Sequence, residues 1–125
     1  MDAGYSIEER GDVTVISLLR TLTKQEILGI IDVIASLGRR EKRLWILGDH
    51  VRLTAEEMSE IGNYGREKIE GPSRVAYVAG DDLTFGLTNI QAAYRDVGGF
   101  EDQLFRDEAS AMAWLNEQAS SPPRD

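Results

Sequence analysis

The hydrophobic and polar positions change their period along the chain, and this change predicts the order of the elements. Tyr5–Arg10 alternates weakly, as an edge strand does, and Gly11-Asp12 turns the chain into the β-branched run Val13–Leu19. Helix-like and strand-like segments then alternate, and the last is helical. A hairpin followed by strand–helix units predicts one α/β domain with a mixed sheet of about five strands, flanked by about four helices, in the order β-β-α-β-α-β-α-β-α.

Capping residues predict where the helices begin. Thr23 with Glu26, and Thr54 with Glu57, form capping boxes, in which the hydroxyl and the carboxylate each satisfy a free amide of the first turn. Asp81 or Asp82, and later Asp107, precede two further helical segments as N-cap residues. The domain therefore spans 1–119, and we expect a disordered polar tail over 120–125.

Apolar spacing predicts which faces of these helices turn inward. It places Leu83 and Leu87 on the inner face of the third helix. In the fourth helix it places four residues inward: Ala109, Met112, Ala113 and Leu115. The charged run 39–43 follows the first helix, where its positive charges suit the helix dipole, so we interpret it as a solvated connection.

Composition narrows the function classes. The chain has 125 residues, 42% of them hydrophobic and 29% charged, which suits one globular domain. No cysteine is present, so disulfides and thiolate chemistry are excluded, and a cytoplasmic protein is favoured. The net charge of −8 argues against nucleic acid and anionic lipid as partners. No apolar run reaches the ~20 residues of a membrane span, and no secretory signal is visible, so we expect no integral membrane segment.

Two stretches carry a resemblance to a known family. Arg74–Asp96 reads RVAYVAGDDLTFGLTNIQAAYRD, and Gln103–Leu115 reads QLFRDEASAMAWL. With the order of elements, they resemble the STAS-like domain of anti-sigma-factor antagonists, and in particular a mostly uncharacterised bacterial branch of it. The resemblance implies the STAS-like fold, a cytoplasmic protein and a homodimer. It implies the fold more strongly than any function.

The chain departs from the antagonists at the site of their phosphorylated serine. Those proteins carry this serine in a turn after the third strand, where this chain reads Gly48–Thr54 and has no serine. Asp49 matches the acidic residue of that turn, and the capping role of Thr54 already explains its hydroxyl. The phosphorylation switch therefore does not carry over with the resemblance, and neither do kinase or sigma-factor partners.

Candidate site residues follow the ends of the predicted parallel strands, because ligands favour that edge of an open sheet. His50 is the only histidine, and beside Asp49 it is a candidate general base, although a loop histidine bonded to a neighbour explains it as well. Phe85 is a candidate for an apolar crevice or a dimer contact. The predicted ligand-binding set is Arg20, Asp49, His50, Asp81, Asp82, Phe85 and Arg106.

Three functions compete on these grounds. The first is a non-catalytic STAS-like module that binds a protein partner or an apolar small molecule, with no cofactor and no metal. The alternative is a small hydrolase or isomerase that uses His50 with Asp49. The third is a phosphorylation switch at Thr54 or Thr23. Since no nucleophile stands out beside the histidine, we favour the binding module.

Overall fold

The structure, a computed structural model, describes residues 4–37, 41–69, 73–93 and 100–117. Its strands are β1 (Tyr5–Arg10), β2 (Val13–Leu18), β3 (Lys42–Gly48), β4 (Ser73–Ala79) and β5 (Phe100–Phe105). Its helices are α1 (Lys24–Ser36), α2 (Ala55–Lys68), α3 (Asp82–Ala93) and α4 (Glu108–Leu115). The predicted α/β fold and its element order are confirmed, and the tail predicted for 120–125 lies outside the described residues.

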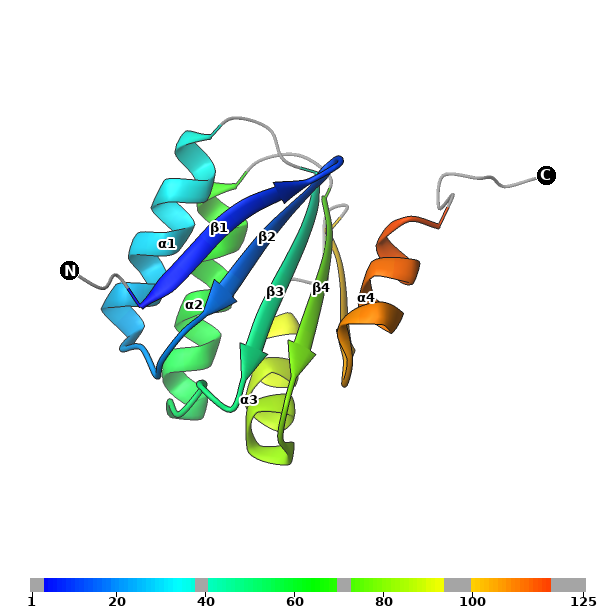
Figure 1. Cartoon of the computed structure of the whole chain (residues 1–125). Coiled ribbons are helices and arrows are strands. Elements are labelled where there is room, and N and C mark those ends of the chain that lie inside the picture. The colour runs from blue at the N-terminus through cyan, green and yellow to red at the C-terminus, as the bar shows by residue number, and fades with distance from the viewer. Residues whose placement is uncertain (1–3, 38–40, 70–72, 94–99, 118–125) are drawn as a thin grey trace.

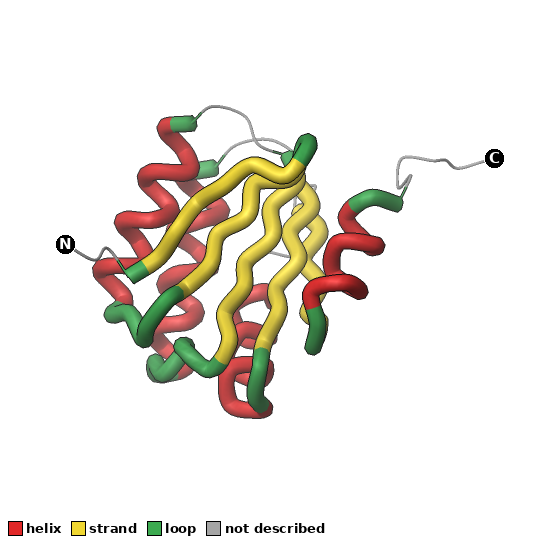
Figure 2. Tube along the Cα trace, viewed as in Figure 1, coloured by secondary structure: helices red, strands yellow, loops and turns green. Residues whose placement is uncertain are grey.

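The strands lie in the sheet in the order in which they follow one another in the chain, β1-β2-β3-β4-β5. β1 pairs antiparallel with β2, and each later neighbour pair is parallel. Crossovers between parallel strands are right-handed, so three successive crossovers in one direction place their helices on one face. Figures 1 and 2 show α1, α2 and α3 on that face and α4 on the opposite one.

Each face of the sheet has its own core, because side chains alternate along every strand. On β2, Ile16 and Leu18 join the larger cluster under α1 and α2, whereas Val13 and Val15 join a smaller cluster under α4. All four side chains are at most 6% exposed, as expected for a strand covered on both faces. The larger cluster is the one that contains the candidate site.

The interpretation of 39–43 as a solvated connection is wrong for its last two residues. Lys42 and Arg43 begin β3, because the parallel ladders with β2 and β4 extend to them. The Arg43 side chain is 2% exposed and lies on the face of the larger core, where one guanidinium nitrogen donates to Ser73 Oγ at 3.3 Å. Strand pairing therefore decides the burial of Arg43 against the preference of its charge for water.

The predicted inner face of α3 is wrong for Leu83, whereas Leu87 packs against the larger cluster as predicted. Leu83 is 51% exposed, whereas Thr84 and Thr88 are 0% and 1% exposed, so the helix is rotated from the expected orientation. The rotation brings Thr84 Oγ1 to 3.1 Å from Arg52 Nη1, a donor in the loop before α2. This hydrogen bond compensates the hydroxyl for the loss of water, which a purely apolar pattern does not anticipate.

In α4, Ala111 and Leu115 are fully buried, whereas Ala109 and Ala113 are exposed, contrary to the prediction for the two exposed alanines. Aromatic contacts explain this rotation. The ring of Trp114 lies 5.8 Å from that of Phe105, and the Arg74 guanidinium lies 4.1 Å from the centre of the Trp114 indole. Arg74 also pairs with Glu101 of β5 at 3.2 Å, which ties α4 to the edge of the sheet.

Within the described part of the chain, none of the helices has both the length and the apolar character that crossing a bilayer requires.

Candidate functional site

A pocket of about 50 Å³ opens between the sheet and the helices that cover its larger core. Its walls come from β2, β3 and β4 on the sheet side and from α1, α2 and α3 on the helix side. Most of the lining side chains are aliphatic or aromatic. The lining consists of Leu18, Ile27, Ile31, Arg43, Trp45, Leu47, Val51, Met58, Ile61, Gly65, Ile69, Tyr77 and Thr88.

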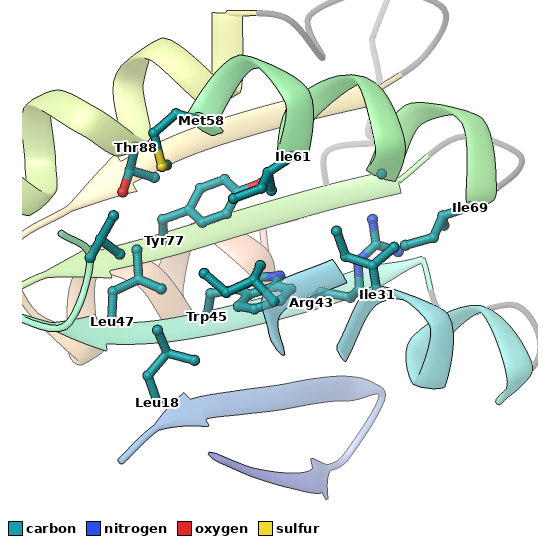
Figure 3. Close-up of a pocket in the computed structure, with 13 residues that line it drawn as sticks. Leu18, Ile31, Arg43, Trp45, Leu47, Met58, Ile61, Ile69, Tyr77 and Thr88 are labelled. Atoms are coloured by element: carbon teal, nitrogen blue, oxygen red, sulfur yellow. The ribbon is translucent and has the colours of Figure 1, made fainter. Parts of the chain in front are cut away.

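The pocket is elongated along β3. Arg43, Trp45 and Leu47 alternate along this strand, so they line the pocket from the same face of the sheet. Four residue steps along a parallel strand correspond to about 13 Å. Figure 3 shows Thr88 and Met58 toward one end of the pocket and Arg43 beside Ile31 toward the other. The two polar side chains in the lining, apart from Tyr77, therefore lie far apart.

The polar groups of the lining differ in how they are satisfied. Arg43 donates to Ser73 Oγ, and the Tyr77 hydroxyl donates to Asp102 Oδ2 at 3.0 Å. Thr88 Oγ1 has no hydrogen-bond partner among the described residues, although the residue is 1% exposed. A buried hydroxyl without a partner costs about 1–3 kcal/mol of stability. Thr88 Oγ1 is thus a fully buried polar atom of the described lining that has no partner among the described residues.

Polar contacts outside the pocket hold α1 and α2 together, and one of them joins Lys68 Nζ to Asp32 Oδ1 at 3.7 Å. Lys24 Nζ lies 2.7 Å from Glu60 Oε1, and the Tyr64 hydroxyl donates to Asp32 Oδ1 at 2.6 Å. The hydrogen bond to Asp32, followed by burial, raises the pKa of Tyr64 above its ordinary value. Because these contacts join two of the helices that line the pocket, they restrain the separation of its helical walls.

The loops at the carboxyl ends of β3 and β4 are joined by Arg52. Its guanidinium pairs with Asp81 Oδ2 at 2.7 Å and donates to Thr84 Oγ1 at 3.1 Å and to Val51 O at 3.0 Å. Asp81 Oδ1 also accepts the Thr84 amide at 3.0 Å, so Asp81 is the N-cap residue of α3. The Thr84 hydroxyl and then Arg52 lower the pKa of Asp81 to about 2.

Four more of the predicted site residues lie in two separate groups at the same edge of the sheet, together with Arg106. Arg106 lies 2.8 Å from Asp82 and 4.4 Å from the centre of the Phe85 ring, so these three residues come together. His50 Nδ1 lies 3.5 Å from Asp49 Oδ1.

Arg20 lies in the segment between β2 and α1, with its guanidinium 2.9 Å from Glu26 Oε2. Together with the Thr23 amide, it lowers the pKa of Glu26 to about 2. The predicted set is therefore distributed over several local pairs rather than gathered around one centre.

None of the residues in the predicted ligand-binding set lines the pocket. In the described ranges there is also no group of three or more His, Asp or Glu residues that could hold a metal ion. The expectation that ligands bind at the carboxyl ends of parallel strands led to residues that form polar pairs at that edge of the sheet. The pocket lies instead beneath the sheet, on the face covered by α1–α3. A role for the strand-end residues in ligand binding stays a prediction.

Two spacings in the sequence correspond to buried polar side chains in or beside the pocket. Thr84 and Thr88 are four residues apart, a spacing that places both on one face of a helix. Arg43 is two residues before Trp45 and four before Leu47, the spacing of side chains on one face of a strand. Polar residues in these registers look like surface positions, and only the packing shows that they are buried.

Comparisons with known proteins identify the fold. No protein-family model matches the chain, and no curated protein matches its sequence. The structure is similar to the crystal structure of an uncharacterized protein from the DUF3478 family, with a SpoIIAA-like fold, from Shewanella loihica PV-4. The TM-score is 0.56 at 19% sequence identity, over 89% of this chain and 91% of that one. The predicted STAS-like resemblance is therefore confirmed as a resemblance of fold.

Proposed function

We propose that this protein is a non-catalytic binding module that holds a small apolar molecule beneath its sheet. The observation that carries the proposal is the pocket of about 50 Å³, lined by aliphatic and aromatic side chains together with a few buried polar groups. Sites for small molecules have this composition, in which apolar walls supply affinity and a few polar groups supply orientation. The SpoIIAA-like fold supports only the scaffold of this proposal.

The lining favours a binding site over a packing defect. Interiors are close-packed, and a void left by poor packing costs stability in proportion to its volume. Small voids of that kind are apolar throughout. This pocket includes the buried hydroxyl of Thr88, which has no hydrogen-bond partner among the described residues, and burying such a group costs free energy. A site that orients a ligand accounts for this group.

The alternative function, a hydrolase or isomerase that uses His50 with Asp49, stays a prediction. The two side chains are 3.5 Å apart and lie outside the lining of the pocket. A catalytic pair needs a concave site that holds substrate against it. The homodimer, the protein partner and the cytoplasmic location also stay predictions.

Trp45 offers a direct test, because its indole lines the pocket. The chain has two tryptophans, so the substitution Trp114→Phe leaves Trp45 as the only one. We expect 1-chlorobutane to change the Trp45 fluorescence of this variant along a saturable curve. A linear response without saturation would mean that the probe acts only through the solvent, and the proposal would be wrong.

A matched pair of substitutions locates the binding. Ile61→Phe adds a ring at the pocket wall, so it should abolish the saturable response. Val33→Phe adds the same ring to α1 at a position that is 36% exposed and outside the lining, so it should leave the response unchanged. Loss of the response in both variants, or in neither, would show that the probe binds elsewhere.

A further inference from the structure

We infer that the ligand of this pocket is an apolar molecule with one uncharged hydrogen-bonding group, a hydroxyl or a carbonyl, and that Thr88 binds this group. The inference rests on the proposed function, because it assigns the chemical class of the ligand at the same site. It makes Thr88 a specificity-determining residue rather than a structural one.

The first support is the unsatisfied hydroxyl itself. Thr88 is 1% exposed, lines the pocket, and has no hydrogen-bond partner for Oγ1 among the described residues. Figure 3 shows its side chain beside Met58 at the end of the pocket. A buried hydroxyl is both a donor and an acceptor, so a ligand hydroxyl or carbonyl placed there forms the missing bond.

The second support is the contrast with Thr84, one turn earlier on α3. Thr84 is equally buried, yet its Oγ1 accepts a hydrogen bond from Arg52 at 3.1 Å. The fold therefore supplies a donor to the buried threonine outside the lining and none to the threonine inside it. This difference is expected if the partner of Thr88 arrives with the ligand.

The surroundings of Thr88 argue that the group it binds is uncharged. Toward this end of the pocket Figure 3 shows Met58 and Leu47, which stabilise no charge. The hydroxyl of Tyr77 is engaged with Asp102, and Arg43 lies toward the opposite end, engaged with Ser73. An ion brought to Thr88 would lose its water without gaining a counter-ion, which costs much more than burying a neutral group.

The volume limits the part of the ligand that enters. A cavity of about 50 Å³ accommodates about four water-sized centres, if each needs 10–15 Å³. A chain of about four carbons with one terminal hydroxyl is a suitable probe on that scale. 1-Butanol has this composition, and 1-chlorobutane carries the same butyl chain with chlorine in place of the hydroxyl.

The experiment titrates the Trp114→Phe protein with both probes and follows Trp45 fluorescence. We expect Thr88→Val, which keeps the shape of the side chain, to weaken 1-butanol binding about tenfold, the loss of one buried hydrogen bond. The affinity for 1-chlorobutane should not fall. Thr88→Ser retains the hydroxyl, so it should restore most of the affinity for 1-butanol.

The two probes separate failure of the inference from failure of the proposed function. If 1-chlorobutane binds saturably but Thr88→Val leaves 1-butanol binding unchanged, the pocket is a binding site and the assignment of Thr88 is overturned. The assignment is also overturned if Thr88→Val weakens both probes equally. If neither probe binds saturably, both the proposed function and this inference are overturned.

Discussion

Thr84 and Thr88 lie one turn apart on the inner side of α3, and only the first has a hydrogen-bond partner for its side chain among the described residues. The Thr84 hydroxyl accepts from Arg52, which also pairs with Asp81 at the N-terminus of the same helix. We therefore expect the two hydroxyls to have opposite effects on stability, although the exposure of the two threonines is nearly the same.

The substitution of each threonine by valine should reveal this opposition. Thr88→Val removes an uncompensated buried hydroxyl, so we expect the free energy of unfolding to rise by about 1 kcal/mol. Thr84→Val removes the acceptor of the Arg52 hydrogen bond, so we expect a loss of about 1–2 kcal/mol. Urea unfolding of both variants measures these differences, and a loss of stability in Thr88→Val would contradict the first expectation.

Acid should weaken the capping arrangement at Asp81. Its pKa is lowered from the ordinary 3.8 to about 2 by the Thr84 hydroxyl and Arg52. A carboxyl group with a depressed pKa stabilises the fold above its unfolded-state pKa and loses this contribution as the pH falls through the folded-state value. We expect the wild-type advantage over Asp81→Asn to be complete above about pH 4 and to disappear toward pH 2. A difference in unfolding free energy that stays constant over this interval would refute the linkage.

A close approach between the end of β3 and the loop after β4 makes Gly80 sensitive to substitution. The Gly80 amide donates to Gly48 O at 2.7 Å, and a Cβ at Gly80 would lie 3.2 Å from the Gly48 backbone. We expect Gly80→Ala to lower stability by about 1–3 kcal/mol, since backbone atoms yield little to overpacking.

Gly86→Ala is the matched control for that substitution. It lies within α3, where an added Cβ meets nothing within 4 Å. It should raise stability by up to about 1 kcal/mol through the higher helix propensity of alanine. Thermal unfolding of both variants measures the difference. If Gly80→Ala is as stable as Gly86→Ala, the backbone at Gly48 and Gly80 moves apart easily to accept the added Cβ.

Two leucines test the observed rotations of the helices. Leu115 of α4 is fully buried, so Leu115→Ala should cost about 2–5 kcal/mol. Leu83 of α3 is 51% exposed, and Leu83→Ala should change stability by about 0.5 kcal/mol or less. Chemical unfolding of the two variants checks the contrast. A cost for Leu83→Ala as large as that for Leu115→Ala would restore the orientation of α3 that its apolar spacing predicts.

The fold was predictable from the sequence because the signals for its elements are local. The capping boxes at Thr23 and Thr54 form as predicted, with each hydroxyl accepting from the amide three residues later. The apolar residues Ile27, Ile30 and Ile34 recur at helical spacing and are all buried in α1. Such signals depend on neighbours within one or two turns, so a single sequence reveals them.

The pocket was not predictable in the same way, because its polar residues are buried by distant partners. Arg43 is a strand residue bonded to Ser73, thirty positions later, and the Tyr77 hydroxyl donates to Asp102, 25 positions later. Composition alone assigns such residues to the surface. The preference of ligands for the carboxyl ends of parallel strands did place Asp81, Asp82 and Arg106 at one edge of the sheet. It gave no indication of the pocket beneath the sheet.

The strand order has a consequence for how the chain reaches this structure. Each strand pairs with the one that precedes it, so no strand waits for a partner from the far end of the chain. Contacts of moderate sequence separation favour fast folding, because less loop-closure entropy is lost before they form. As the chain leaves the ribosome, the sheet can grow from β1 to β5 one strand at a time, and α4 is added last to cover the remaining face.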